Sequence, residues 1–338
     1  MKKLLFVLSC LLTIAVSTTV RSAASPQQES VVDPDSTLCV IGWFNKCDTL
    51  TYWINESGWK IGGVDTVRTS SATVKVRVNV VDSTANGYKM EYTFLEFPTD
   101  TLPESAPFMQ KFQNDLIAKV SKKIIGTTVQ FETDELGSIT KFNNLGKIKK
   151  QADYILKETL NELSQVPEIK AAKNMGLDMN ALVQKFGDND IIIENYLKEL
   201  KILFANHGYT FNKGISTEHL VATDSTYECD SYCSVLEDPE NGSYQILRTV
   251  NNIIPESKLK EVFGDILSTI SKQDITDGAK KIADKQINND GSIEQYLKID
   301  YIPNGWPYSV INQKTTIIGE YVEINQTTIA LDSYHFAE

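Results

Sequence analysis

Four tryptophans are the side chains in this sequence best suited to contacting a ligand directly. Trp43, Trp53 and Trp59 are close together near the N-terminus, and Trp306 lies in the turn 303–308. Indole rings stack on sugars and on apolar faces, so an exposed group of them would form a platform for a carbohydrate or a protein. Tryptophans in strands are, however, highly buried on average, which favours core packing. The four residues are the candidate ligand-binding residues.

Cysteine chemistry is the next candidate, through Cys39, Cys47, Cys229 and Cys233. An even number of cysteines in an exported protein favours disulfides, and four cysteines allow three pairings. We expect the local pairing, Cys39 with Cys47 and Cys229 with Cys233. Neither pair has the C-x2-C spacing of structural zinc sites, and the second is one residue too long for a redox C-x-x-C motif. The sequence therefore predicts disulfides and no metal site.

Motifs for catalysis or cofactor binding are missing from the sequence. It has three histidines, His207, His219 and His335, and no HExxH, GxSxG, P-loop or GxGxxG motif. We expect surface or helix-capping histidines. Residues 286–297 match part of a calcium loop but lack its first carboxylate and its last glutamate. Facing carboxylates could support glycoside hydrolysis, but sequence spacing singles out no pair. The prediction is a non-enzyme without a cofactor, and a carboxylate-dependent hydrolase is the weaker alternative.

The N-terminus predicts export. Lys2 and Lys3 precede the apolar run 4–16, and the small residues 22–24 follow a polar stretch, as in a signal peptide cut after Ala24. The apolar run is shorter than the ~20 residues of a membrane-spanning helix. A lipoprotein processed at Cys10 is the alternative, although it would leave a very short apolar run before that residue. The expected location is periplasmic or extracellular, with no transmembrane segment in the mature chain.

Composition limits the partners. Apolar residues make up 41% of the chain and charged residues 23%, as in globular proteins, and the formal net charge is −11 at pH 7. An acidic chain without a basic cluster repels nucleic acid and anionic membrane surfaces. Nucleic acid is therefore not expected as a partner.

The elements that would position these residues come in clusters. After the signal peptide 1–24 and a flexible tether 25–37, we expect a single domain over 38–335. Its first strands show clean alternation: Val74, Val76 and Val78 alternate with polar residues, and Asn86-Gly87 is a strong hairpin signal. The expected elements are strands 38–97, helix 104–125, strands 127–142, helices 145–206, strands 209–252, helices 255–288 and strands 292–332.

This order predicts the fold class. Strands and helices that come in clusters, without strict alternation, indicate an α+β fold. We expect a curved antiparallel sheet, built from strand clusters at both ends of the chain and packed against long helices. The central block 145–206 has the longest helical periodicity in the chain.

Two stretches carry a resemblance to a known group. The sequence from Gly126 to Gly137 and the Asn304–Pro307 turn resemble those of uncharacterised exported envelope proteins of Gram-negative bacteria, classed as domains of unknown function. The order of elements from Cys39 to Asp332 is also loosely similar to the half-barrels of periplasmic lipoprotein carriers. That likeness implies a space for acyl chains between sheet and helices, and no residue carries over.

The functional prediction combines these points. Large apolar residues on a strand, Tyr88 to Phe94, are expected to face Leu160, Tyr196 and Phe204 of the helices. A groove between them would hold a lipid or another amphipathic ligand. The predicted function is an exported, non-enzymatic cell-envelope protein of this kind. The alternative is a module that binds a glycan or an envelope protein through its tryptophans.

Overall fold

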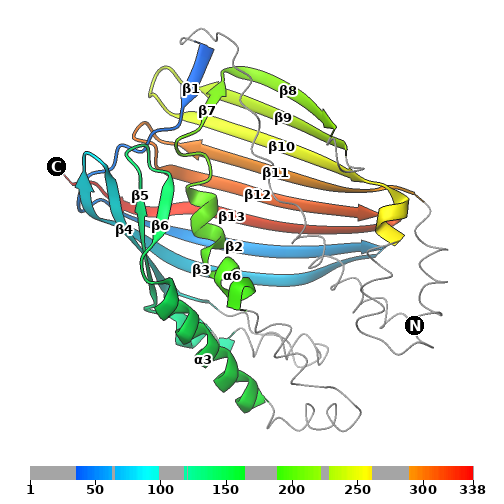
Figure 1. Cartoon of the computed structure of the whole chain (residues 1–338), viewed down its shortest axis with the longest axis horizontal. Helices are drawn as coiled ribbons and strands as arrows, with labels where there is room; N and C mark the ends of the chain where they lie inside the picture. The colour runs from blue at the N-terminus through cyan, green and yellow to red at the C-terminus, as the bar shows by residue number, and fades with distance from the viewer. Residues whose placement is uncertain are drawn as a thin grey trace.

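The computed structural model describes residues 36–62, 65–98, 118–119, 121–163, 189–221, 228–260 and 289–337. Its strands form one antiparallel sheet of 11 strands and a separate pair (Figure 1). The strands are β1 (Thr37–Cys39), β2 (Thr49–Gly62), β3 (Asp65–Thr84), β4 (Gly87–Glu96), β5 (Thr128–Thr133), β6 (Ile139–Phe142), β7 (Thr210–Asn212), β8 (Gly214–Val221), β9 (Glu228–Glu237), β10 (Tyr244–Ile254), β11 (Gly291–Tyr301), β12 (Pro307–Ile318) and β13 (Tyr321–His335).

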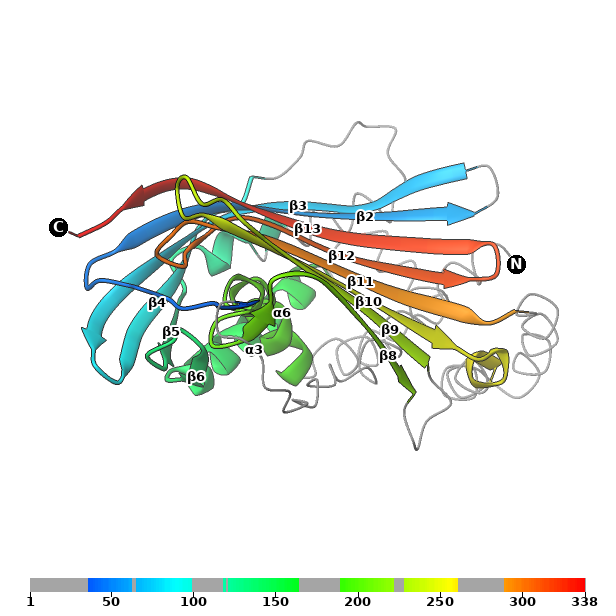
Figure 2. The same cartoon turned by 90° about the horizontal axis from the view of Figure 1, so that it is seen from above.

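The large sheet has the order β6-β5-β4-β3-β2-β13-β12-β11-β10-β9-β8, and β1 pairs with β7. Neighbouring strands are mostly joined by hairpins, but β2 lies beside β13. This pairing joins the strands at the two ends of the chain into one surface. Seen from above, the sheet arches over the helices, so it has a convex and a concave face (Figure 2).

Alternating side chains explain the face that each strand buries. On β3, Val76, Val78 and Val80 are at most 1% exposed, and they pair with Phe94, Tyr92 and Met90 of β4. Removing a large apolar side chain fully from water stabilises a fold by roughly 1.5–3 kcal/mol. The predicted Asn86-Gly87 hairpin is confirmed, and Gly87 adopts a φ of 128°.

Two helices lie on the concave side. Helix α3 (Leu145–Leu163) buries Ile148, Ala152 and Ile155, which recur at helical spacing. Helix α6 (Asn189–Leu203) buries Leu197, Leu200 and Leu203 in the same core as the strands. Its chain then turns through Gly208, whose φ of 79° is the left-handed conformation that commonly follows the end of a helix. None of the helices in the described ranges is both long and apolar enough to cross a membrane.

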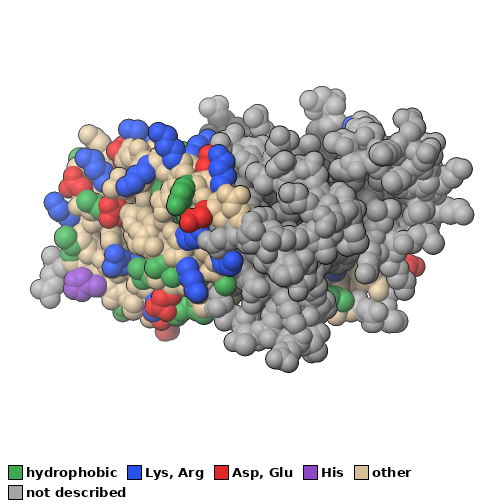
Figure 3. Space-filling model, turned by 90° about the horizontal axis from the view of Figure 1, so that it is seen from below, with side chains coloured by type: hydrophobic (Ala, Val, Ile, Leu, Met, Phe, Trp, Pro, Cys, Tyr) green, Lys and Arg blue, Asp and Glu red, His purple; other side chains and the backbone are tan. Residues whose placement is uncertain are grey.

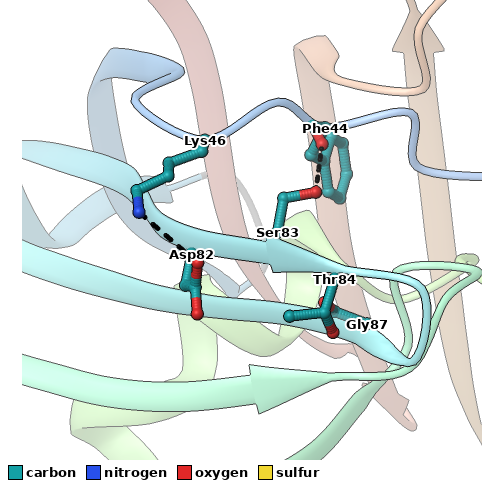
Figure 4. A network of polar contacts seen from close by, with 6 residues as sticks. All are labelled: Phe44, Lys46, Asp82, Ser83, Thr84 and Gly87. Atoms are coloured by element: carbon teal, nitrogen blue, oxygen red, sulfur yellow. Dashed lines mark hydrogen bonds and ion pairs between the residues drawn. The ribbon is translucent and has the colours of Figure 1, made fainter.

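Residues 40–48 close one end of the sheet. The amide of Gly42 donates to Leu136 O, and the amide of Trp43 donates to Asn304 O, both at 2.9 Å. Figure 4 shows how the β3–β4 hairpin holds this segment: Ser83 Oγ donates to Phe44 O at 3.2 Å, and Lys46 pairs with Asp82 at 3.6 Å. These contacts place the Phe44 ring over the core.

The predicted α+β class is wrong. The described chain is mostly antiparallel sheet, and no long helices pack on it. Helical periodicity identifies segments that can form helices, but it does not show what share of the chain joins a single sheet. Most of the predicted helices 104–125 and 255–288 lie outside the described residues; a helix does begin at Glu256, whose amide donates to Asp290 Oδ1 at 2.8 Å.

The residues Asn55 to Gly58 have the composition of a turn, and the sequence alone predicts one there, but this prediction is wrong. Strand β2 runs through these residues without a break, and its pairing with β3 shifts register between Gly58 and Trp59 because β3 has one extra residue there. Pairing with β3 on one side and β13 on the other supplies hydrogen bonds along its whole length, which outweighs the local turn preference of Asn, Ser and Gly.

Candidate functional site

Strand register divides the concave face into rows. One row crosses six strands, is entirely apolar and is at most 3% exposed: Ile54, Ile329, Val310, Ile299, Ile246 and Val235. The next row on the same face is largely polar: Glu56, Thr327, Asn312, Leu297, Arg248 and Cys233. Since paired residues of antiparallel strands share a face, the surface changes from apolar to polar over two residues of each strand.

The apolar row is covered by an aromatic cluster beyond the end of α6. The ring of Phe44 lies 4.0 Å from that of Trp306 and 6.2 Å from that of Phe204, measured between centroids. Phe204 also meets Phe131 of β5, at 5.5 Å. Strand and helix faces therefore pack directly against one another here, where the sequence predicted a groove. Of the expected helix partners, the side chains of Leu160 and Tyr196 lie outside those described.

His207 is a core residue within this cluster. It is 0% exposed, and its Nε2 lies 3.0 Å from Gly305 O. Burial lowers the pKa of His207 from 6.5 to about 4. The ring is thus neutral at pH 7, with Nε2–H as the donor, and its buried Nδ1 has no partner among the described residues. The expectation of a surface or capping role is wrong for His207, but His219 is exposed and pairs with Asp230 at 2.6 Å.

A first polar cluster lies beside the aromatic one and comprises Asn206, Arg248 and Tyr301. Arg248 faces inward from β10, and its Nη1 donates a long hydrogen bond of 3.5 Å to Asn206 Oδ1. The phenol of Tyr301 is 0% exposed, and burial raises its pKa, so the hydroxyl stays protonated. Asn206 Nδ2 and Tyr301 OH are both buried, and a side-chain hydrogen bond from Asn206 partly offsets the raised pKa of Tyr301.

A second polar cluster holds α6 against β2. Lys198 pairs with Glu56 at 2.5 Å, while the neighbouring Glu199 is 8% exposed. Burial, with the nearby charge of Glu56, raises the pKa of Glu199 from 4.5 to about 7. The two carboxyl groups share a hydrogen bond, which requires a proton on one of them. As the pH rises through about 7, the pair therefore loses its proton to solvent, and the net charge between α6 and β2 becomes more negative.

The tryptophans do not form a platform. Trp306 is 1% exposed and belongs to the core, whereas Trp43 is 66% exposed on the loop 40–48. Trp53 and Trp59 point outward from β2, six residues apart, which corresponds to about 20 Å along a strand. Lys75 Nζ lies 4.9 Å from the Trp53 ring, in a cation–π contact. Trp53 and Trp59 are therefore too far apart to stack on one small ligand, and Trp306 is not accessible to one.

The four cysteines carry free thiols. Cys229 and Cys233 lie on one strand, β9, with about 13 Å of extended chain between them. A disulfide requires Cα atoms within about 7 Å, so the predicted bridge between these two residues is incompatible with the strand. In the described residues, no three His, Cys, Asp or Glu side chains are grouped to hold a metal.

A small cleft lies between β5 and the start of α3. Its volume is about 400 Å³, and its lining includes Thr127, Gln130, Asn144 and Gln151. Two hydrogen bonds occupy these groups: Gln151 Nε2 donates to Thr127 Oγ1 at 2.7 Å, and the main-chain amide of Gln130 donates to Asn144 Oδ1 at 2.9 Å. The polar groups that line the cleft are hydrogen-bonded to one another, so the cleft is not an apolar groove for a ligand.

Sequence patterns did not predict either polar cluster. Glu56 continues the inward positions of Leu50, Tyr52 and Ile54, and a charge at an inward position of a strand is a signal that could have been found. Glu199 similarly sits between the core residues Leu197 and Leu200 on the helix. The closeness of Arg248 to Asn206 depends on the tertiary fold and has no sequence signal.

The fold and these sites define a large antiparallel sheet protein with polar clusters buried against its concave face. No protein-family model and no curated protein matches the chain. Lipovitellin, solved in a study of lipid–protein interactions, is similar over 87% of this chain and 26% of its own, with 10% identity and a TM-score of 0.38. An outer membrane channel from Pseudomonas putida F1 is similar over 89% of this chain and 100% of its own, with 7% identity and a TM-score of 0.14. The chain thus spans only a minor part of lipovitellin, and neither likeness is strong enough to bear on function.

Proposed function

We propose that this chain is an exported, non-enzymatic cell-envelope protein that binds an amphipathic ligand, such as a lipid, against the concave face of its sheet. The observation that carries this proposal is the change from an apolar to a polar row across six neighbouring strands. A molecule with an apolar part and a polar part matches such a face in both respects.

The support is strongest on β10 and β11. Leu297 lies directly opposite Arg248, and Val250 follows two residues along the same face. All three are only partly buried, whereas Ile246 and Ile299, in the apolar row, are 0% exposed. Apolar and cationic side chains are therefore adjacent at one place on the inner face.

Charge argues against some other partners. On the face seen in Figure 3, the described part carries acidic and basic side chains intermixed with small apolar areas. Together with the net charge of −11, this favours a single ligand over an extended anionic surface such as nucleic acid.

The proposal is tested by native mass spectrometry of the mature protein, purified from a Gram-negative host without detergent. A reproducible added mass that is lost on organic extraction and identified as a lipid is the expected result. A clean mass of the protein alone would contradict the proposal.

Two variants of β10 sharpen this test. Val250→Asp places a charge on the concave face, and Thr249→Asp places the same charge on the convex face one residue away. We expect the first to lose the added mass and the second to keep it. Loss in both variants, or in neither, would mean that the mass is not bound on the concave face.

The carboxyl pair favours a second candidate, a carboxylate-dependent hydrolase. Glu199, with a pKa of about 7, has the protonation state that a general acid needs near neutral pH, and Glu56 lies beside it. A panel of glycosides and esters tests this candidate with the wild type and Glu199→Gln. Turnover that the variant loses would support hydrolysis, and no turnover by the wild type would remove it.

A further inference from the structure

The outer side of α3 and the chain just before β5 carry a local excess of positive charge. Residues 118–158 contain eight lysines and five acidic residues, whereas the whole chain has 33 basic and 44 acidic residues. The expectation that no basic cluster offsets the acidic charge of the chain therefore does not hold for this part of the molecule.

A stripe of lysines runs along the exposed side of α3. The buried residues of this helix lie on one side, and with about 3.6 residues per turn Lys147, Lys150, Tyr154 and Lys157 point away from it. All four side chains are exposed, and Tyr154 is 64% exposed. An aromatic ring therefore lies in water among three ammonium groups.

The small polar cleft joins this stripe to a second exposed apolar side chain. Ile125 and Lys147 both line the cleft, and Ile125 is 47% exposed. Lys122, one helical turn before Ile125, is exposed as well. Lys123 Nζ pairs with Glu158 at 2.8 Å, which connects this segment to α3. We call the resulting surface the basic face, and it comprises Lys122, Ile125, Lys147, Lys150, Tyr154 and Lys157.

Acidic side chains on α3 do not cancel the charge of the basic face. Glu158 is already neutralised by Lys123, and Asp153, beside the stripe, offsets one lysine. The negative charge of the rest of the chain acts weakly here, because exposed charges more than ~8 Å apart are largely screened at physiological ionic strength. A partner that touches only the basic face therefore meets a positive surface.

We propose that the basic face docks on the surface of an anionic lipid bilayer, with Ile125 and Tyr154 among the head groups. Lysines close to such a surface are attracted to it, and tyrosine rings and apolar side chains settle at the boundary between head groups and acyl chains. Nucleic acid offers charge alone and would leave both apolar side chains in water. The inference goes beyond the proposed function and does not depend on the ligand of the concave face.

The test is cosedimentation of the full mature chain with vesicles of two compositions. One contains equal parts of phosphatidylglycerol and phosphatidylcholine, and the other contains phosphatidylcholine alone. We expect the protein to bind the anionic vesicles and not the zwitterionic ones. Raising the ionic strength from ~0.1 M to ~1 M shortens the screening length from ~10 Å to ~3 Å and should release most of the protein.

Two pairs of lysine variants locate the contact. Lys150→Gln combined with Lys157→Gln should weaken binding to the anionic vesicles by about thirtyfold. Lys46→Gln combined with Lys213→Gln is the matched control, because it removes the same charge from the loop 40–48 and from the chain before β8. The control pair should bind as the wild type does.

A third pair tests the apolar part of the contact. Ile125→Ser combined with Tyr154→Ser should weaken binding by roughly tenfold and keep its dependence on salt, because it removes apolar area and no charge. Both side chains are exposed, so the variant is expected to fold, and thermal melting checks this for every variant.

Several results would overturn the proposal. They are absence of vesicle binding, equal binding to both compositions, and equal losses in the two lysine pairs. A DNA duplex that binds as tightly as the anionic vesicles, or serine variants that bind like the wild type, would show a contact through charge alone and would also overturn it. None of these results changes whether a lipid copurifies with the protein, so the proposed function is judged separately.

Discussion

Replacing Glu199 by glutamine is expected to stabilise the protein above pH 7 and to leave it almost unchanged in acid. Burial and the charge of Glu56 raise the pKa of Glu199 from 4.5 to about 7, so the folded state holds a proton that the unfolded chain has released. An acid with a raised pKa therefore makes its full contribution to stability below pH 4.5 and loses it as the pH rises toward 7. Glutamine resembles the protonated carboxyl group and does not ionise.

The size of this stabilisation follows from the pKa shift of Glu199. One pKa unit corresponds to about 1.4 kcal/mol, so the free energy of unfolding of Glu199→Gln relative to wild type should rise by about that amount per pH unit. Between pH 4.5 and 7 the gain reaches about 3 kcal/mol and then levels off. His207 acts in the opposite direction, because its lowered pKa costs stability as the pH falls from 6.5 to about 4. The two contributions have opposite signs over overlapping pH ranges, so each partly offsets the other in the wild type.

Urea denaturation at half-unit intervals from pH 4.5 to 8.5 measures both curves, and their difference isolates Glu199. Glu194→Gln on the same helix is the control, since Glu194 is exposed and paired with Lys201 at 2.7 Å. Its difference curve should stay flat. A flat or falling curve for Glu199→Gln would refute the assignment of a buried proton to this site.

Further predictions concern the closed end of the sheet and the thiols. Gly305→Ala should lower the free energy of unfolding by about 1–3 kcal/mol, as measured by thermal melting. Gly305 has a φ of 83°, and an added Cβ would lie 2.1 Å from a backbone carbonyl oxygen. An unchanged melting temperature would contradict this geometry. Acrylamide should quench Trp43 readily and Trp306 hardly at all, as single-tryptophan variants would show, since their exposures are 66% and 1%. Mass mapping of the native protein should find no bridge between Cys229 and Cys233, and finding one would show that β9 is not continuous there.

Several features of the fold could be predicted from local patterns. The alternation on β3 and β4 and the Asn86-Gly87 turn determine a hairpin and the face it buries. Helices α3 and α6 likewise lie within the block 145–206 that helical periodicity predicts. The α+β class was not predictable in this way, because the share of the chain that joins a single sheet depends on pairings such as β2 with β13, which bring the two ends of the chain together.

The sequence by itself determined the local elements, the acidic charge and the absence of familiar catalytic motifs, because each depends on neighbouring residues or on composition. The tertiary structure alone decided which side chains meet. Glu56 and Glu199 are brought together by the packing of α6 on β2, Arg248 of β10 meets Asn206 just after the end of α6, and His207 contacts the loop that carries Gly305. Contacts of this kind join residues far apart in the chain, and their energies come from burial and charge that no local pattern records.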